Sequence, residues 1–208
     1  MQIDSFWPVH RGVARVEAEL YRRRHLDEPW LTRQSISLLR DLLRPSDRCL
    51  EWGSGTSTTW FARRVGTLVS VEHDPAWLAR VQADLTRRQL SADVRLLGTS
   101  PLRTNETPPY VSVIDEFDEG GLDVCLVDGE LRAQCVLAAI PKLARGGLLI
   151  VDDAHGLLDH PTDSPHARVG QGPVTAQWGE IAESLRDWRL MWTSDGYSDT
   201  AIWVKPAA

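Results

Sequence analysis

The sequence predicts an open, doubly wound α/β fold, in which one mostly parallel sheet of seven strands carries helices on both faces. Short apolar runs alternate with longer segments of helical composition from Arg48 onward, and this alternation is the pattern of a parallel sheet. Several of these runs end in an acidic residue, as expected where the carboxyl ends of strands line one ligand site. The length of 208 residues fits one domain with a full core.

Two helices are expected before the sheet. Residues 10–25 are rich in arginine and glutamate and carry apolar residues at helical spacing, which predicts an exposed amphipathic helix. A second helix is expected over residues 32–43, where leucines and an isoleucine share one face. We therefore divide the single domain, 1–208, into an N-terminal helical cap, 1–45, and an α/β core, 46–208.

The core is expected to alternate strands and helices along the chain. The expected strands cover residues 48–51, 67–72, 94–97, 122–127, 148–151, 188–192 and 200–204. The expected helices between them cover residues 58–65, 75–89, 131–144 and 175–186. Asp74 and Pro75 supply an N-cap and a first-turn proline for the second of these helices. The Arg145-Gly146-Gly147 run is expected to stop the third.

Two long connections interrupt this alternation. Residues 101–121 are polar and rich in turn formers, and they are too many for a routine connection. We expect an active-site flap there, or a peripheral hairpin through residues 110–114. Residues 155–174 hold three histidines among prolines and glycines, at spacings that match no standard zinc pattern. This second connection is expected to be a substrate lid or a plain surface loop.

Residues 49–58 predict a strand, a tight turn and the start of a helix. The apolar run ends in Glu51, and Gly53 and Gly55 follow. Glycines permit backbone angles and a close ligand approach that a side chain would block, and a helix start presents unpaired amide groups. Glu72 ends the next apolar run, where such sheets place a carboxylate that accepts hydrogen bonds from ribose hydroxyls. We expect a nucleotide-like ligand; the alternative is an ordinary glycine-rich turn with an unrelated glutamate.

Acids after the fourth and fifth expected strands indicate a metal site. Asp128 follows one strand, and Asp152 and Asp153 follow the next. These strand ends are adjacent in the expected topology, so the three carboxylates are expected to converge on one hard divalent cation. An all-carboxylate ligand set favours Mg²⁺. The alternative is that Asp128 caps the following helix while Asp152 and Asp153 orient their loop.

The glycine turn resembles the first motif of class I S-adenosylmethionine (SAM)-dependent methyltransferases, an acid followed by three alternating glycines. Glu51, Gly53 and Gly55 match this motif, and Ser57 stands at the place of the last glycine. The resemblance implies a Rossmann-like sheet whose last strand is antiparallel. It also implies SAM as cofactor, with the glycine turn under its methionine part and Glu72 on its ribose.

Two further stretches resemble O-methyltransferases of this class. The Gly98-Thr99-Ser100 run is similar to a run of the catechol type, which implies that Ser100 contacts the adenine; the alternative is a turn serine. Residues 123–155 resemble the cation-dependent O-methyltransferases. Their Asp-Gly-acid run and Asp-Asp pair are most similar to the sugar O-methyltransferases of macrolide and aminocoumarin biosynthesis.

This second resemblance implies roles for the acids at the strand ends. The implied metal ligands are Asp128, Asp152 and Asp153. Glu130 would be the general base, with Asp128 beside it at the reacting centre. Leu131 stands where the catechol type carries its lysine base, which excludes that variant. His155, next to the acidic pair, is an alternative base because the unperturbed pKa of histidine lies near neutrality.

Composition excludes several other classes of function. The net charge of -6 disfavours a nucleic acid or an anionic membrane as partner, because both attract cationic surfaces. The sequence shows neither a secretory signal at its N-terminus nor an apolar run long enough to span a bilayer. The three cysteines have no metal-ligand spacing, so we expect buried free thiols. We expect a cytoplasmic protein with a small-molecule or glycan acceptor, and the sequence leaves a homodimer open.

Three alternative functions stay open from the sequence. A metal-independent methyltransferase would use the same cofactor without Mg²⁺. A nicotinamide oxidoreductase is disfavoured, because Thr58 stands where the dinucleotide fingerprint has its third glycine. A non-catalytic scaffold that keeps the fold is disfavoured by the intact acids and glycines around the first turn.

Overall fold

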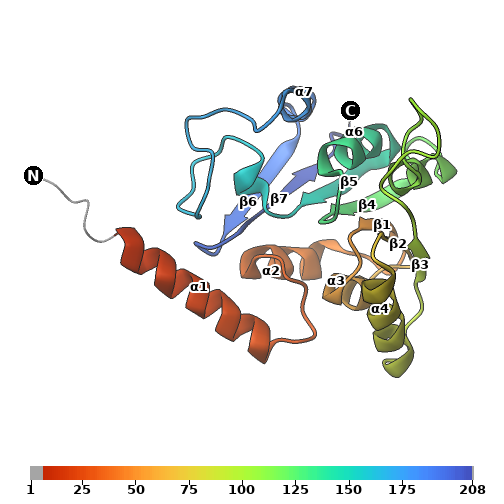
Figure 1. The fold of residues 1–208 in the computed structure, drawn as a ribbon, viewed down its shortest axis with the longest axis horizontal. Coiled ribbons are helices and arrows are strands. Elements are labelled where there is room, and N and C mark those ends of the chain that lie inside the picture. The colour runs from red at the N-terminus through yellow and green to blue at the C-terminus, as the bar shows by residue number, and fades with distance from the viewer. Residues whose placement is uncertain (1–6, 208) are drawn as a thin grey trace, which may run out of the picture.

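Seven strands form one mixed sheet between two layers of helices in the computed structural model, which describes residues 7–207 and side chains from residue 15 onward (Figure 1). The strands are β1 (Arg48–Trp52), β2 (Thr67–Glu72), β3 (Asp93–Leu96), β4 (Leu122–Val127), β5 (Leu143–Val151), β6 (Arg189–Ser194) and β7 (Asp199–Val204). The helices are α1 (Trp7–Arg24), α2 (Arg33–Leu42), α3 (Thr56–Phe61), α4 (Pro75–Arg87), α5 (Pro109–Ser112), α6 (Arg132–Lys142) and α7 (Ala176–Ser184).

The strand order is β3-β2-β1-β4-β5-β7-β6. The first five strands of this order are parallel to one another, while β7 is antiparallel to both β5 and β6. The predicted fold class and the antiparallel last strand are therefore confirmed. The strand order reverses between β1 and β4, and ligands of open α/β sheets bind beside the carboxyl ends of strands at such a point.

Side chains of the central strands alternate between two apolar layers. On β4, for example, Cys125 and Val127 join one buried cluster, whereas Val124 and Leu126 join the other. In Figure 1, α6 and α7 lie over one face of the sheet and α2, α3 and α4 lie over the other. A strand segment buried on both faces needs apolar residues at every position, which explains the apolar run over residues 124–127 of β4.

The N-terminal helices differ in how they pack. Helix α2 buries Ile36 and Leu39 against the sheet, and the side chain of Thr32 caps its N-terminus. Helix α1 stands beside the main body in Figure 1, and its Val16 is 58% exposed. The apolar face expected for α1 lies partly outside the described side chains. None of the helices in the described part of the chain is long and apolar enough to span a bilayer.

Residues 110–114 of this connection enter the core as a helical segment, so the expected hairpin is wrong, while residues 101–107 are exposed. The chain folds there into α5 and a 3₁₀ turn over Val113–Glu116. Pro109 stands in the first turn of the helix, where its missing N–H costs nothing. Tyr110 is fully buried, and its carbonyl oxygen accepts a hydrogen bond of 2.7 Å from the indole of Trp52. Burial of apolar side chains at helical spacing therefore outweighed the polar composition of the connection.

The helix expected to run to residue 144 ends at Lys142, and β5 begins at Leu143. The Arg145-Gly146-Gly147 run lies within the strand and is not a helix stop, so that prediction is wrong. The ammonium of Lys205 donates to the carbonyl oxygens of Ile140 and Leu143, at 2.9 and 2.7 Å. A lysine far along the chain thus satisfies the carbonyls that the helix end exposes.

The connection over residues 155–174 is tied to the body of the protein. Asp159 accepts hydrogen bonds from the backbone N–H groups of Gly170 and Gly172, at 2.8 and 2.9 Å. The hydroxyl of Ser164 donates to the buried carboxylate of Asp199 on β7. The three cysteines are buried and unpaired, as expected.

Candidate active site

The glycine turn after β1 packs directly against the loop after β4. Gly53 has a φ of +96°, a conformation that side chains rarely adopt. A Cβ atom on Gly53 would lie 2.7 Å from the backbone nitrogen of Gly129. A Cβ on Gly129 would in turn lie 2.0 Å from the hydroxyl oxygen of Tyr110. Both turns therefore need glycine, and together they form one rigid floor.

Glu51 supports this floor from below. It is fully buried, and its Oε2 accepts hydrogen bonds from the hydroxyls of Thr58 and Ser70, at 2.6 and 2.5 Å. The Thr58 hydroxyl accepts in turn from the backbone N–H of Gly55, at 2.9 Å. Burial raises the pKa of Glu51 to about 7, although the hydrogen bonds from the neighbouring hydroxyls lower it in part. Glu51 thus shapes the turn without lining its cavity. The sequence analysis did not identify its partners Thr58 and Ser70. Their hydroxyl groups were the only signal of this role in the sequence.

A cavity of about 430 Å³, the first cavity, opens above the glycine turn. It is lined by Trp30, Gly53, Ser54, Gly55, Thr56, Ser57, Glu72, His73, Asp74, Trp77, Asp128, Gly129, Glu130 and Arg132. Of the predicted site residues, it brings together the glycines, the serine of the turn, and acids from the ends of β2 and β4. Its volume lies within the range of small-molecule sites.

Glu72 lies buried at the end of β2 and faces the first cavity. Its Oε1 accepts hydrogen bonds from the backbone N–H groups of His73 and Asp74, at 2.7 and 2.8 Å. These bonds hold the carboxylate in one orientation. No hydrogen bond among the described residues uses Oε2, so that atom can still accept one. Its contact with a ribose hydroxyl stays a prediction.

Two tryptophans form walls of the first cavity that sequence reasoning did not assign. Trp77, on the first turn of α4, donates its indole N–H to the carbonyl oxygen of Ser54 at 2.6 Å. Trp30 comes from the segment before α2 and is 53% exposed; the guanidinium of Arg22 lies 5.5 Å from its ring centroid. Flat aromatic walls suit a heterocyclic ligand. Nothing in the scattered spacing of the tryptophans distinguished these two.

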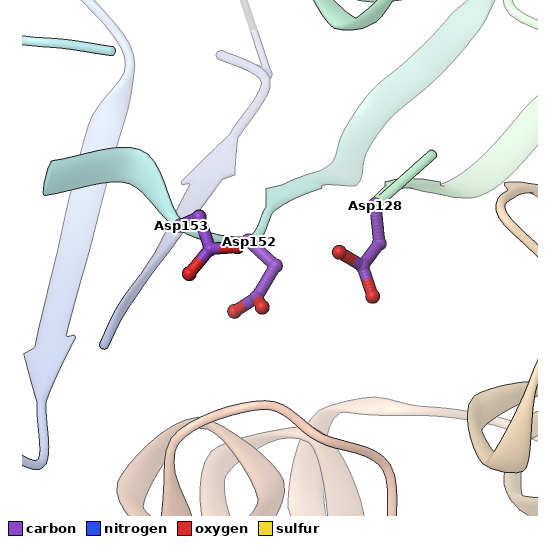
Figure 2. Close-up of side chains that lie close together, drawn as sticks. All are labelled: Asp128, Asp152 and Asp153. Atoms are coloured by element: carbon purple, nitrogen blue, oxygen red, sulfur yellow. The ribbon is translucent and has the colours of Figure 1, made fainter. Parts of the chain in front are cut away.

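Asp128, Asp152 and Asp153, the acid cluster, meet where β4 and β5 end. Each offers an oxygen such that the three lie within 4.8 Å of one another, and Figure 2 shows the side chains extending from the two adjacent loops. Burial and the other two carboxylates raise the pKa of Asp152 well above its usual range. Burial raises the pKa of Asp128 to about 6, opposed by the charge of Arg132. The predicted convergence of the three acids is present.

Asp128 does not cap helix α6, so the alternative reading of this acid is wrong. The residue at the N-cap is Leu131, in a left-handed conformation with a φ of 51°, and no side chain caps the helix. The carboxylate of Asp128 instead accepts a hydrogen bond from Arg132 at 3.1 Å.

Arg132 joins the two loops that carry the acid cluster. Its guanidinium donates to the carbonyl oxygens of Asp152, Gly129 and Asp128, at 2.6, 3.0 and 3.1 Å. It also lies 3.8 Å from a carboxylate oxygen of Asp153. Three ionised carboxylates and one guanidinium carry a net charge of about -2, which matches the charge of one divalent cation. Sequence reasoning missed Arg132, although its position directly after the Asp-Gly-Glu-Leu run was a usable signal.

A second cavity, of about 460 Å³, adjoins the first. It is lined by Gly129, Glu130, Leu131, Arg132, Ala133, Gln134, Leu157, Thr175, Gln177 and Trp178. Gly129, Glu130 and Arg132 line both cavities. The exposed carboxylate of Glu130 therefore stands between them.

Several predicted residues line neither cavity, namely Glu51, Asp152 and Asp153, described above, and also Ser100 and His155. Ser100 is exposed and lines neither one, so its contact with a ligand stays a prediction. His155 follows Asp153 but also lines neither cavity. Its Nδ1 is buried and has no hydrogen-bond partner among the described residues. Of the two candidate bases, Glu130 and His155, only Glu130 therefore lines the cavities.

Comparison with known proteins finds a family match across this region. A family model described as a methyltransferase domain matches residues 50–154, just over half of the chain, from β1 through the acid cluster. No curated protein matches the chain.

Solved structures share the fold at low sequence identity. A methyltransferase-like protein of Silicibacter pomeroyi is 22% identical, covers 86% of this chain and 89% of its own, and has a TM-score of 0.56. A methyltransferase of Geobacter sulfurreducens is 14% identical, covers 93% and 88%, and has a TM-score of 0.55. An rRNA methylase of Streptococcus thermophilus is 9% identical, covers 83% and 95%, and has a TM-score of 0.56. At these identities the likeness shows the fold alone.

The family match spans the glycine turn, Glu72 and both loops of the acid cluster in one continuous segment. The sheet order and the antiparallel β7 are those expected of this fold. The chain therefore belongs to the methyltransferase-domain family, as a class I SAM-dependent methyltransferase.

Proposed function

We propose that this methyltransferase transfers the methyl group of SAM to a hydroxyl of a small molecule or sugar, with help from a divalent cation. The observation that carries the proposal is the acid cluster at the ends of β4 and β5, directly beside the first cavity. A hydroxyl is the acceptor for which an oxygen-ligated cation is useful, because coordination lowers the pKa of the hydroxyl and orients it.

SAM is assigned to the first cavity. Glu72 would accept hydrogen bonds from the ribose hydroxyls through Oε2, and the glycine turn would lie under the methionine part. Gly55 supports this assignment, because only the hydroxyl of Ser57 comes within 4 Å of a Cβ built there. A ligand can thus approach the backbone closely at this point. Trp30 and Trp77 would limit the access of water to the cofactor.

The acid cluster fits a hard divalent cation. Its donors are carboxylate oxygens, which Mg²⁺ prefers, and the charge of Arg132 leaves about -2 to be balanced. Asp128, Asp152 and Asp153 would hold the ion. When bound, Mg²⁺ supplies Lewis-acid activation of the acceptor hydroxyls.

The acceptor is assigned to the second cavity, which combines apolar and neutral polar side chains. Leu131, Leu157 and Trp178 line it together with Gln134, Thr175 and Gln177, a set that suits an uncharged molecule with hydroxyl groups. Glu130 stands between this cavity and the first, so we assign it the proton of the acceptor hydroxyl. The acceptor oxygen then attacks the methyl carbon of SAM in line. An O–C bond forms as the S–C bond of the sulfonium breaks, and S-adenosylhomocysteine leaves. Asp128 would hold the reacting hydroxyl through the cation.

The first test is calorimetric titration with S-adenosylhomocysteine, followed by transfer of a labelled methyl group from SAM to a panel of vicinal diols, sugars and catechols. We expect micromolar cofactor binding, about -8 kcal/mol, and turnover that a chelator abolishes and Mg²⁺ restores. Asp152→Asn is expected to lose the response to Mg²⁺ while it retains cofactor binding. Asp163→Asn, at an exposed position outside both cavities, serves as the control.

The outcomes separate the alternatives. If a chelator leaves turnover unchanged, the protein is a metal-independent methyltransferase. Arg132 alone would then balance the negative charge of the acid cluster. The absence of cofactor binding would favour the non-catalytic scaffold.

A further inference from the structure

Two hydroxyl groups at the start of β7, one just before the strand and one on it, donate hydrogen bonds to the acid cluster. The hydroxyl of Thr200 donates to Asp152 Oδ1 at 2.7 Å, and that of Ser198 donates to Asp153 Oδ1 at 2.8 Å. Residues two apart on a strand point to the same face. Because β7 is antiparallel to β5, with Ala201 paired to Val151, the start of β7 lies beside the loop that carries the two acids.

The direction of the Thr200 hydrogen bond follows from its other partner. The backbone N–H of Thr32 donates to Thr200 Oγ1 at 3.1 Å, and a backbone N–H can only donate. The hydroxyl oxygen of Thr200 therefore accepts from Thr32, and its proton is free for Asp152. Thr200 is fully buried, and Asp152 is 5% exposed, so water does not compete for this geometry.

Thr32 is itself held in place. Its side chain caps α2 by accepting from the backbone N–H of Ser35, and its hydroxyl lies 2.5 Å from that of Thr193. Thr193 donates to the carbonyl oxygen of Thr200 at 3.0 Å. The N-terminus of α2, strands β6 and β7, and Asp152 thus form one buried hydrogen-bond chain.

We propose that Thr200 is a positioning residue for the divalent-cation site: it holds Oδ1 of Asp152 and turns Oδ2 toward Asp128 and Asp153. This assignment rests on the cation site proposed above. Ser198 acts in the same way on Asp153, where the bond is more exposed. Partners that orient a metal-binding carboxylate typically change metal affinity 10- to 100-fold when they are removed.

The experiment measures cation binding, not activity. The full-length protein is titrated with Mn²⁺, and the free ion is measured by electron paramagnetic resonance. Thr200→Val removes the hydroxyl and keeps the shape of the side chain, and we expect it to weaken Mn²⁺ binding about 10- to 100-fold. Thr200→Ser keeps the hydroxyl and is expected to restore binding. Thr193→Val is the matched control. It removes another hydroxyl of the same hydrogen-bond chain, and this hydroxyl does not contact the acid cluster.

Two further measurements exclude a purely structural effect. The affinity for S-adenosylhomocysteine is expected to be unchanged in Thr200→Val, because Thr200 does not line the first cavity. If Thr200→Val binds Mn²⁺ as the wild type does, or if Thr193→Val weakens binding equally, the positioning role is overturned. If the wild-type protein itself binds no Mn²⁺, the cation site is overturned together with this assignment.

Discussion

At the scale of single residues, Glu72 is the acid whose geometry is best prepared for a ligand. Two backbone N–H groups hold its Oε1, so ligand binding through Oε2 requires little reordering of the side chain. Glu72→Gln retains the acceptor for those N–H groups but loses the charge. We expect a loss of about 1.5–3 kcal/mol in the affinity for S-adenosylhomocysteine, measured by calorimetry. Glu106→Gln, an exposed charge-matched change outside the first cavity, is expected to bind normally; equal affinities in both variants would remove Glu72 from the site.

Glu51 makes stability depend on pH. Its pKa in the folded protein, about 7, lies above the ordinary value of 4.5. Between these values the folded protein keeps a proton that the unfolded chain has released, so the free energy of unfolding falls as pH rises through this window. One pKa unit corresponds to about 1.4 kcal/mol, so the fall amounts to at most about 3 kcal/mol.

Glu51→Gln should remove this fall, since glutamine does not ionise. We expect the variant to be more stable than the wild type at pH 8 and to gain nothing at pH 4. Urea unfolding at both pH values measures the difference. Because Asp128 and Asp152 also have raised pKa values, part of the pH dependence should persist in the variant. A parallel fall in both proteins would contradict the assignment to Glu51.

At the scale of elements, the contact between the turns after β1 and β4 holds the two halves of the site together. Gly129→Ala would place a methyl group 2.0 Å from the hydroxyl oxygen of Tyr110 and 2.9 Å from the nitrogen of Gly53. We expect a loss of about 1–3 kcal/mol in the free energy of unfolding, the usual cost of overpacking, together with weaker cofactor binding.

A second substitution separates the two contacts. Adding Tyr110→Phe removes the nearer clash and should recover part of the stability of Gly129→Ala, but not all of it, because the backbone of Gly53 remains close. Gly98→Ala is the control, since a Cβ there meets nothing within 4 Å. Thermal unfolding of the four proteins tests the prediction. A Gly129→Ala variant as stable as Gly98→Ala would show that the turns separate easily.

Strand β7 shows how one element serves two sides of the site. Ser198 and Thr200 face the acid cluster. Asp199, between them, points to the other face and binds Ser164 and the indole of Trp192. The alternation of side chains along a strand therefore lets three consecutive residues hold the two acids and also anchor the connection over residues 155–174.

At the scale of the whole molecule, the net charge predicts that the acceptor is not a nucleic acid. An rRNA methylase shares its fold, but the net charge here is -6, and phosphate binding needs a cationic surface. We expect no measurable binding to a structured ribosomal RNA fragment at 150 mM salt, about the physiological level, in a filter-binding assay. Micromolar or tighter binding that weakens steeply with added salt would contradict the small-molecule proposal.

The order of strands and helices was predictable from local patterns. Apolar runs marked each of the seven strands, and Asp74 and Thr175 cap α4 and α7 at positions their residue types favour. Because the carboxyl ends of parallel strands share one edge of a sheet, the convergence of the acids after β4 and β5 also followed. The sequence by itself therefore determined the fold class, the cofactor turn and the position of the acid cluster.

Contacts between distant segments decided the rest. Residues 110–114 entered the core, where the carbonyl oxygen of Tyr110 accepts a hydrogen bond from the indole of Trp52. Lys205 binds carbonyls at the end of α6, more than sixty positions earlier. Thr32 and Thr200 are separated by 168 positions, so no spacing in the sequence could pair them. A hydroxyl or a guanidinium carries no periodic signal of its own. Its role depends on which partner the tertiary structure brings within hydrogen-bond distance, and only the folded chain shows that partner.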